Sequence, residues 1–448
     1  MNKKELNIAD NISDKSELFL AQTDDTWLKR IVHTKRFWFF YLPMIIYLGL
    51  STISFIVATF YDLQIAAAAG KLMRFKAVRV FVLIYDEIGD TQLFFAEIFA
   101  IAILWECFVS ILAIKTKVKF FQHWTFPWIA YAIILFVWNF CNITRCVHTI
   151  TGDAGLGVGN DPKAVLSYWW RFGVQLGIHI VETVAMCWVI YYMRFQIKDK
   201  AVLIDEEYYI GCLKMIFHVF ITYFILIVLK RSFGRPFYYS VDFHNIYQNE
   251  LQPLGWDFEY TVMWGSGDGT KNATYFAWYE PNDFLGNIKY WFNDAGAKGD
   301  SNSWWNNDFP SGHTVGTFCL FALFFYIVAN DDKKINKKTV IFFWTILAHI
   351  TILQISLLIY RFHWLTDLNF STMFCIPCFW LVNWLGNLAG YLLRTSIRAW
   401  TGKENHAVFI YQKNKWSFYL VNPYNQQLEF VSNLKNHEKS VFTLHQKV

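Results

Sequence analysis

The chain has 448 residues, of which 55% are hydrophobic and 20% aromatic but only 17% charged. Soluble domains carry about 25% charged residues, so this composition excludes an ordinary soluble protein and predicts one embedded in a membrane. The formal net charge of +5 gives no reason to expect nucleic acid binding, because the excess of Lys and Arg lies in loops on one side of the expected membrane spans.

Eight apolar stretches reach, or nearly reach, the length of about 20 residues that a helix needs to cross a hydrocarbon core of roughly 30 Å. They are residues 37–60, 93–114, 124–143, 174–193, 209–229, 314–329, 339–360 and 368–393. The sixth stretch is short, and the third contains Pro127. The predicted fold class is therefore all-α, a polytopic membrane helix bundle with about eight spans.

The loops predict how the chain is oriented. Residues 1–36 are polar, lack a cleavage site typical of a signal peptide and end in a basic pair, so the first helix is expected to act as the membrane signal. Lys and Arg are enriched in both termini and in the alternate loops, which predicts cytoplasmic termini. We expect an integral protein of the plasma membrane, divided into a cytoplasmic segment, five spans, an extracytoplasmic loop, three spans and a cytoplasmic tail: 1–36, 37–229, 230–312, 313–393 and 394–448.

Two of the soluble regions have distinct compositions. Residues 231–312 mix Gly, Asn and Asp with many Trp and Tyr, which is typical of turns anchored by aromatic side chains at a membrane interface. This loop is either a lid over a site or only a structured loop. The tail alternates enough to predict short strands. All eight cysteines fall in or beside apolar stretches, so no disulfide framework is expected.

Three polar stretches are expected at one face of the membrane, because each follows or precedes a span that ends or starts outside. They read "LKRSFGRPFYYS" at 229–240, "NDFPSGHT" at 307–314 and "SLLIYRFHWLTDLNFS" at 356–371. Each places cations, histidines or both at a helix end.

Histidines and carboxylates in these stretches suit phosphate-ester chemistry. A neutral imidazole attacks phosphorus well when a carboxylate holds its other nitrogen. His363 and Asp367 are four residues apart and are expected to face each other on one helical turn. His313 would protonate the departing oxygen, because a lipid alkoxide is a poor leaving group.

Cations and backbone amides must hold the phosphoryl oxygens as negative charge spreads over them. Lys230, Arg235 and Arg361 are the candidate cations. Ser311 and Gly312 precede the sixth span, where helix-terminal amides can face an anion. No metal and no other cofactor is expected, because the cations take the place of a magnesium ion and no carboxylate cluster is evident.

The three stretches resemble the signature motifs of the type 2 phosphatidic acid phosphatase (PAP2) superfamily. The second motif, Pro-Ser-Gly-His, is present at 310–313, and the third fits Ser356, His363 and Asp367. The first fits Lys230 and the inner Gly-Arg pair at 234–235. The resemblance covers roughly residues 209–393. It implies that His363 becomes a phosphohistidine, that His313 is the acid, and that a lipid phosphate from the bilayer is the substrate.

Two arginines of the family pattern are absent, since Phe237 and Leu357 stand in their places. Arg361 follows Leu357 by one turn and is expected on about the same helix face, and Arg235 is expected to reach the same anion. Three functions stay open: a lipid phosphate phosphatase, a phosphotransferase with an acceptor other than water, and a catalytically degenerate protein that binds anionic lipid.

Overall fold

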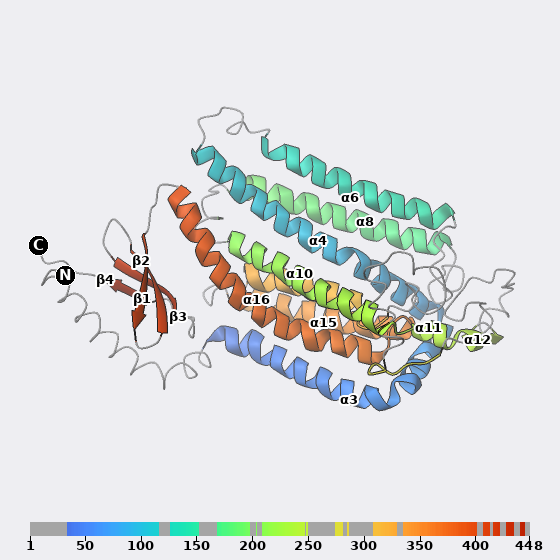
Figure 1. The fold of residues 1–448 in the computed structure, drawn as a ribbon. Coiled ribbons are helices and arrows are strands. Elements are labelled where there is room, and N and C mark those ends of the chain that lie inside the picture. The colour runs from blue at the N-terminus through green and yellow to red at the C-terminus, as the bar shows by residue number, and fades with distance from the viewer. Residues whose placement is uncertain are drawn as a thin grey trace, which may run out of the picture.

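The computed structural model describes residues 34–115, 126–151, 168–197, 208–246, 274–280, 308–328 and 335–400, four strands between 406 and 443, and the short pieces 203, 248–249 and 285. The predicted N-terminal segment and most of the predicted outer loop lie outside the described residues. Figure 1 shows a bundle of long helices that run roughly side by side.

The first half of the chain forms four long helices. A π-helical turn, η1, leads into the first of them, and a 3-10 turn, η2, connects the first helix to the second. The fourth helix continues into a π-helical turn, η3. The elements are η1 (Phe37–Tyr41), α3 (Leu42–Gly70), η2 (Lys71–Arg74), α4 (Lys76–Lys115), α6 (Phe126–Thr151), α8 (Tyr168–Tyr191) and η3 (Tyr192–Gln196).

The second half begins with a long helix and two short ones and continues, after the outer loop, with three further helices. The first of these three ends in a π-helical turn. The elements are α10 (Tyr208–Phe233), α11 (Tyr238–Val241), α12 (Phe243–Ile246), α14 (Gly312–Leu323), η8 (Phe324–Val328), α15 (Lys337–Ile359) and α16 (Leu365–Trp400).

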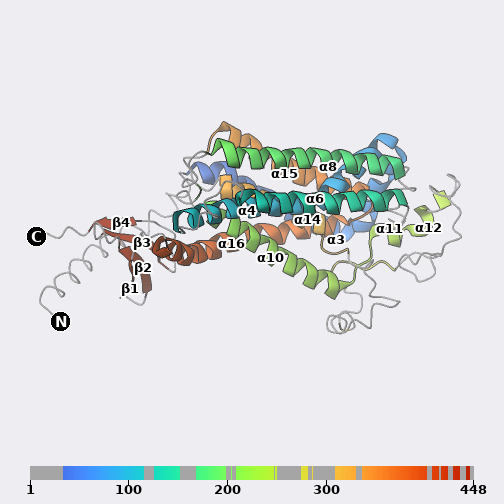
Figure 2. The same ribbon diagram turned by 90° about the horizontal axis from the view of Figure 1, so that it is seen from above.

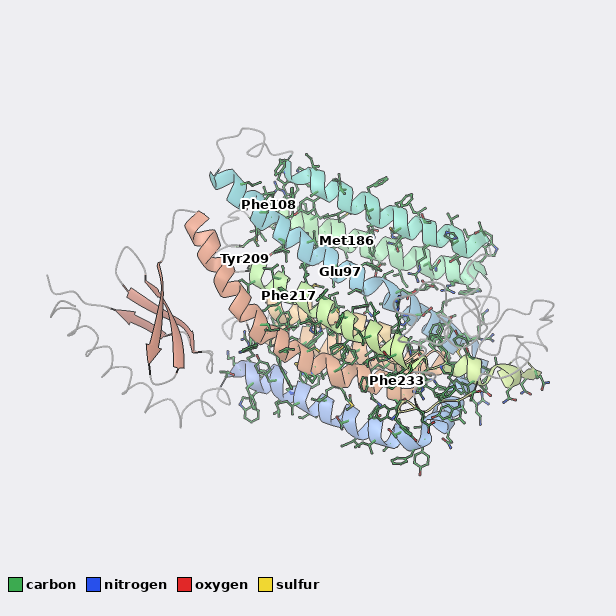
Figure 3. The ribbon with its side chains drawn as sticks, viewed as in Figure 1. Glu97, Phe108, Met186, Tyr209, Phe217 and Phe233 are labelled. Carbon is green, nitrogen blue, oxygen red and sulfur yellow. The ribbon has the colours of Figure 1, made fainter. Side chains whose placement is uncertain are left out.

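Among the described residues, seven helices are long and apolar enough to cross a membrane, and Gly312–Val328 is a shorter apolar helix. The predicted helical membrane bundle is thereby confirmed, including its short sixth member. Its outer faces carry large apolar side chains such as Phe108 and Phe217, which are 43% and 46% exposed (Figure 3). Such exposure is expected where lipid rather than water surrounds a protein.

Several helix ends differ from the prediction, and the start of the second span differs most. The second span was expected to start at residue 93, but α4 begins at Lys76. The difference arises because Asp86, Glu87 and Asp90 interrupt the apolar run in the sequence. In the structure Arg145 and Arg171 pair with these carboxylates, so the charged turns continue the helix at acceptable cost.

The tail contributes a four-stranded antiparallel sheet in the order β1-β2-β3-β4, so the all-α class holds for the membrane part only. Strands β1 and β2 pair from His406 opposite Val421 to Gln412 opposite Lys415. The register between β2 and β3 shifts at Phe418 and Tyr419. The predicted short strands of the tail are thus present, as β1 (His406–Gln412), β2 (Lys415–Val421), β3 (Gln427–Asn433) and β4 (Ser440–Thr443).

Helix α14 is enclosed by other helices, because it packs against α4, α10, α15 and α16 and most of its side chains are buried. Helices α6 and α8 lie side by side and cover α4 on one flank of the bundle (Figures 1 and 2). The start of α14 is therefore surrounded by helix ends from several parts of the chain. These ends build the candidate site.

Candidate active site

The three polar stretches meet at one end of the bundle, where α10 and α15 end and α14 and α16 begin. Lys230, in the last turn of α10, donates from Nζ to the carbonyl oxygen of Asp308 at 3.1 Å. The rings of His313 and His363 lie edge to face, with centroids 5.9 Å apart. The structure thus brings together residues that are distant in the sequence.

The start of α14 is fixed by hydrogen bonds of Ser311. Its hydroxyl caps the helix by accepting from the amide of Thr314 at 3.4 Å, and its own amide donates to the hydroxyl of Ser371 at 2.8 Å. The amide of Ser311 is therefore already used, contrary to the expectation that it faces an anion. Gly312 and His313 occupy the first turn, where amides have no acceptor within the helix, so these two can face a phosphate.

Asp308 is the carboxylate closest to the imidazole of His363. Its Oδ1 lies in direct contact with Nδ1 of His363, whereas Oδ2 of Asp367 is 4.0 Å from the same nitrogen. His363 and Asp367 do lie close to each other, as expected, but they do not share one helical turn, because α16 begins only at Leu365 and His363 precedes it. Sequence analysis missed Asp308, although it lies two residues before Pro310 in the same polar stretch.

Asp367 belongs to a buried ion-pair network with Arg235 and Asp62. Nη1 of Arg235 donates to Oδ1 of Asp367 at 2.6 Å, and Nη2 donates to Oδ2 of Asp62 at 2.9 Å. Nε donates to the carbonyl oxygen of Phe276 at 3.0 Å. All three guanidinium nitrogens therefore donate to protein oxygens, and the geometry favours a structural ion pair over the predicted phosphate contact.

Asp367 also starts α16. Its Oδ2 accepts from the amide of Trp364, 3.4 Å away, which satisfies one of the free amides at this helix end. The indole of Trp364 stacks below the guanidinium of Arg235, with 4.6 Å from Cζ to the ring centroid. This packing joins the first and third motifs into one rigid unit.

Arg361 is placed differently from the prediction. Helix α15 ends at Ile359, and Arg361 adopts a left-handed backbone conformation with φ of 67°. The expectation that it shares a helix face with Leu357 is wrong, because no helix connects the two positions. Nη2 of Arg361 donates to the carbonyl oxygen of Gly70 at 2.9 Å. An added Cβ at Gly70 would lie 2.8 Å from Nε, so glycine permits this approach.

His313 is held by carboxylates of α4 that sequence analysis missed. Nε2 of His313 lies 3.0 Å from Oδ1 of Asp90 and 3.7 Å from Oδ1 of Asp86. The signal in the sequence was weak, because these residues lie beside an apolar stretch and resemble a solvent-exposed loop. Only the extension of α4 to Lys76 turns them toward the second motif.

Burial sets the charge states of the groups outside the membrane-spanning helices. It lowers the pKa of His363 well below its ordinary value, and the charge of Lys230 lowers it further, so His363 is neutral at physiological pH. Burial raises the pKa of Asp308 to about 8, although Lys230 acts in the opposite direction. A neutral imidazole next to a carboxyl group that gains or loses its proton near pH 8 is suited to act as a nucleophile.

The same residues form a group of possible metal donors. One ligand atom each from Asp308, His363 and Asp367 lies within 4.8 Å of the others. The expectation that no carboxylate cluster is present is therefore wrong. The direct contact between Asp308 and His363, and the use of Asp367 by Arg235, nevertheless favour pairing within the protein over a bridging ion.

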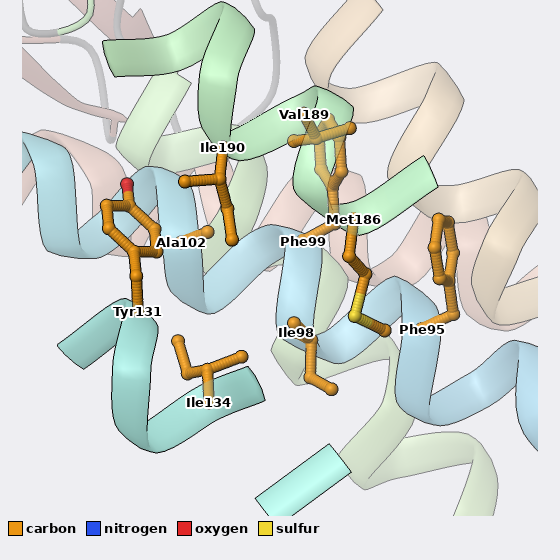
Figure 4. Close-up of a pocket in the computed structure, with 9 residues that line it drawn as sticks. All are labelled: Phe95, Ile98, Phe99, Ala102, Tyr131, Ile134, Met186, Val189 and Ile190. Atoms are coloured by element: carbon orange, nitrogen blue, oxygen red, sulfur yellow. The ribbon is translucent and has the colours of Figure 1, made fainter. Parts of the chain in front are cut away.

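A small apolar pocket lies between α4, α6 and α8 (Figure 4). The side chains that line it are apolar or aromatic, and Met186 and Phe95 point into the gap between the helices. Tyr131 is the one with a polar group, and its hydroxyl donates to Glu106 at 2.6 Å. This pocket has no group for acid, base or phosphate chemistry and is separate from the candidate site.

Two histidines, a lysine and helix-terminal amides thus meet at one end of a membrane helix bundle. Residues 208–390, less than half of the chain, match the family model of the PAP2 superfamily. This match supports a phosphatase-type function in general.

A protein of Mycoplasma capricolum subsp. capricolum, described as uncharacterized, is 26% identical over 364 residues, and the alignment covers 75% of this chain and 90% of that protein. The similarity therefore extends beyond residues 208–390. No solved structure matches the chain.

Proposed function

We propose that this protein is a membrane lipid phosphate phosphatase that hydrolyses a phosphomonoester or diphosphate of a lipid through a phosphohistidine. The observation that supports it most is the contact between Nδ1 of His363 and Asp308, with His313 beside them. A carboxylate on Nδ1 keeps the proton there and leaves the lone pair on Nε2 free to attack.

In the first step, Nε2 of His363 forms a bond to phosphorus, and the bond from phosphorus to the lipid oxygen breaks. His313 gives that oxygen a proton, so the lipid leaves as a neutral alcohol. In the second step, water attacks phosphorus while His313 takes its proton, and the bond from nitrogen to phosphorus breaks. Phosphate leaves, and both histidines return to their starting states.

Charge on the transferred group is stabilised by Lys230 and by the first-turn amides of Gly312 and His313. These groups stand where a metal ion acts in other phosphoryl-transfer sites, so the proposed reaction is metal-independent. The site would open at the extracytoplasmic end of a plasma-membrane protein whose termini are cytoplasmic. The lipid chains would remain in the bilayer beside the exposed apolar helix faces.

A catalytically degenerate lipid-binding protein is the second candidate, favoured by one specific observation. Phe237 and Leu357 replace two arginines of the family pattern, and Arg235 and Arg361 donate to protein oxygens. A phosphotransferase would use the same covalent step with a different acceptor, and the products distinguish it.

The test uses the full chain purified in detergent with a metal chelator and a panel of lipid phosphates. We expect phosphate release that vanadate inhibits and that His363→Ala abolishes. His148→Ala is the matched control, because His148 is an exposed histidine of α6 outside the site. Lipid binding without turnover would contradict the phosphatase and support the degenerate protein. Phosphate recovered on a new acceptor would identify a transferase.

A further inference from the structure

We propose that α4, together with α6 and α8, forms a socket that positions His313, with Asp90 as the positioning residue. These helices precede the residues that match the superfamily, 208–390. The inference rests on the proposed function, since His313 is the acid of that reaction. It assigns a role to helices that the three motifs do not include.

The imidazole of His313 is held on its Nε2 side. Asp90 contacts this nitrogen at 3.0 Å, and Asp86, one helical turn earlier, lies 3.7 Å away. The other charged or titratable groups that face the ring are Lys230 from α10 and His363 from the turn before α16. A protonated imidazole carries a second N–H at Nδ1, which remains for the leaving oxygen while Nε2 stays bound to Asp90.

Helix α4 also shapes the space around the histidine. An added Cβ at Gly89 would lie 2.7 Å from Cδ2 of His313, so only glycine allows the ring to lie this close to α4. Gln92 donates to the hydroxyl of Thr317 at 2.6 Å and to the carbonyl oxygen of His313 at 3.4 Å. His349 contacts the side-chain oxygen of Gln92 at 3.0 Å and so fixes its orientation. The side chain and the backbone of His313 are thus both located by α4.

Arginines from α6 and α8 fix the acidic face of α4. Arg145 contacts Asp90 directly and lies 2.6 Å from Oε2 of Glu87. Arg171 donates from Nε to Oε1 of Glu87 at 2.8 Å and lies 3.9 Å from Oδ2 of Asp86. Gln175 adds a hydrogen bond of 3.1 Å to the same oxygen of Glu87. The carboxylates cannot turn away from His313 without breaking these pairs.

The acidic and basic side chains of the socket together favour one charge state of His313. The three carboxyl groups of Asp86, Glu87 and Asp90 face the two guanidinium groups of Arg145 and Arg171. Asp86 and Glu87 are buried, whereas Asp90 is partly exposed, and negative charge beside buried carboxyl groups is costly unless a cation completes the set. Protonated His313 completes it, so the socket favours the charge state that an acid catalyst needs.

The test compares leaving groups. A lipid alkoxide needs a proton to leave, whereas p-nitrophenolate does not, so loss of the acid should separate the two substrates. For Asp90→Asn we expect turnover of a short-chain phosphatidic acid to fall by about 10²–10³-fold. The pre-steady-state burst of p-nitrophenol from p-nitrophenyl phosphate should stay close to that of the unchanged protein. Arg145→Gln should show a smaller loss of the same kind, and Arg145→Lys should restore part of it.

Glu182→Gln is the matched control, because Glu182 is a carboxylate of the same three-helix group that accepts from Thr91 at 2.7 Å. It should leave both substrates unaffected. Equal losses on both substrates in Asp90→Asn, with unchanged thermal stability in detergent, would overturn the socket, as would no loss on either. If the unchanged protein released no phosphate and showed no burst, the proposed function itself would fail, and the socket with it.

Discussion

Replacing Asp308 by asparagine tests which carboxylate holds the nucleophile. Above about pH 8, where Asp308 is ionised, the substitution keeps the shape of a fully buried side chain and removes its charge. The two side chains are in ion-pair contact, and a contact as strong as a hydrogen bond to a charged group contributes about 1.5–3 kcal/mol, which corresponds to roughly 10–150-fold in rate. An amide can also donate to Nδ1 and place the proton on Nε2, and the wrong tautomer alone costs about 10⁴-fold in serine proteases. We expect turnover to fall by about 10²–10⁴-fold.

The assay measures phosphate release and, in parallel, the phosphohistidine trapped at alkaline pH from a labelled substrate. Both signals should fall together in Asp308→Asn, because the defect precedes attack on phosphorus. Asp242→Asn is the control, since Asp242 lies near the same end of the bundle but bonds to Tyr238 and Asn245. The reasoning would be refuted if Asp308→Asn kept its turnover while Asp367→Asn, with folding intact, lost the phosphohistidine.

Three further predictions follow from the same geometry. Burial raises the pKa of Asp308 from 3.8 to about 8, so the folded protein holds a proton that the unfolded chain loses above pH 3.8. The bound proton's contribution to the free energy of unfolding should therefore disappear as pH rises through about 8. Activity that needs the ionised carboxylate should increase over the same pH range. If Asp308→Asn left the pH profile unchanged, the prediction would be contradicted. Gly89→Ala should push the imidazole of His313 aside and lower turnover by about 10²-fold. Gly173→Ala should leave turnover unchanged, because the space around Gly173 is open. Equal turnover in the two variants would count against the close packing of Gly89 and His313. Arg235→Met should lower the free energy of unfolding by about 3–5 kcal/mol, because two buried carboxylates lose their partner. Denaturant unfolding in detergent measures this loss, and Arg231→Met, at an exposed arginine, is the comparison. Equal stability of the two variants would refute the ion-pair network.

The motifs could be recognised from the sequence because each is a local string of letters. Pro310 to His313 is contiguous, and the spacing of His363 and Asp367 is short. The loss of the family arginines at Phe237 and Leu357 was equally visible. What Arg235 and Arg361 do instead was not visible, since Asp62 and Gly70, which accept their hydrogen bonds, belong to α3, far from either motif in the sequence.

Helix ends were the weakest part of the prediction. Hydropathy excludes a charged turn from a span, so α4 was expected to begin after Asp90. In the structure its carboxylates meet guanidinium groups of α6 and α8, and the paired charges are stable where single charges are not. A rule that reads one segment at a time contains no information about such partners.

The sequence by itself determined the membrane bundle and the resemblance of residues 208–390 to the superfamily, because the length of apolar runs and short motifs are properties of neighbouring residues. Tertiary structure alone decided which carboxylate contacts each histidine: Asp308 for His363 and Asp90 for His313. These pairings depend on how helix ends pack in three dimensions, and an ion pair requires a contact distance that spacing along the chain does not specify.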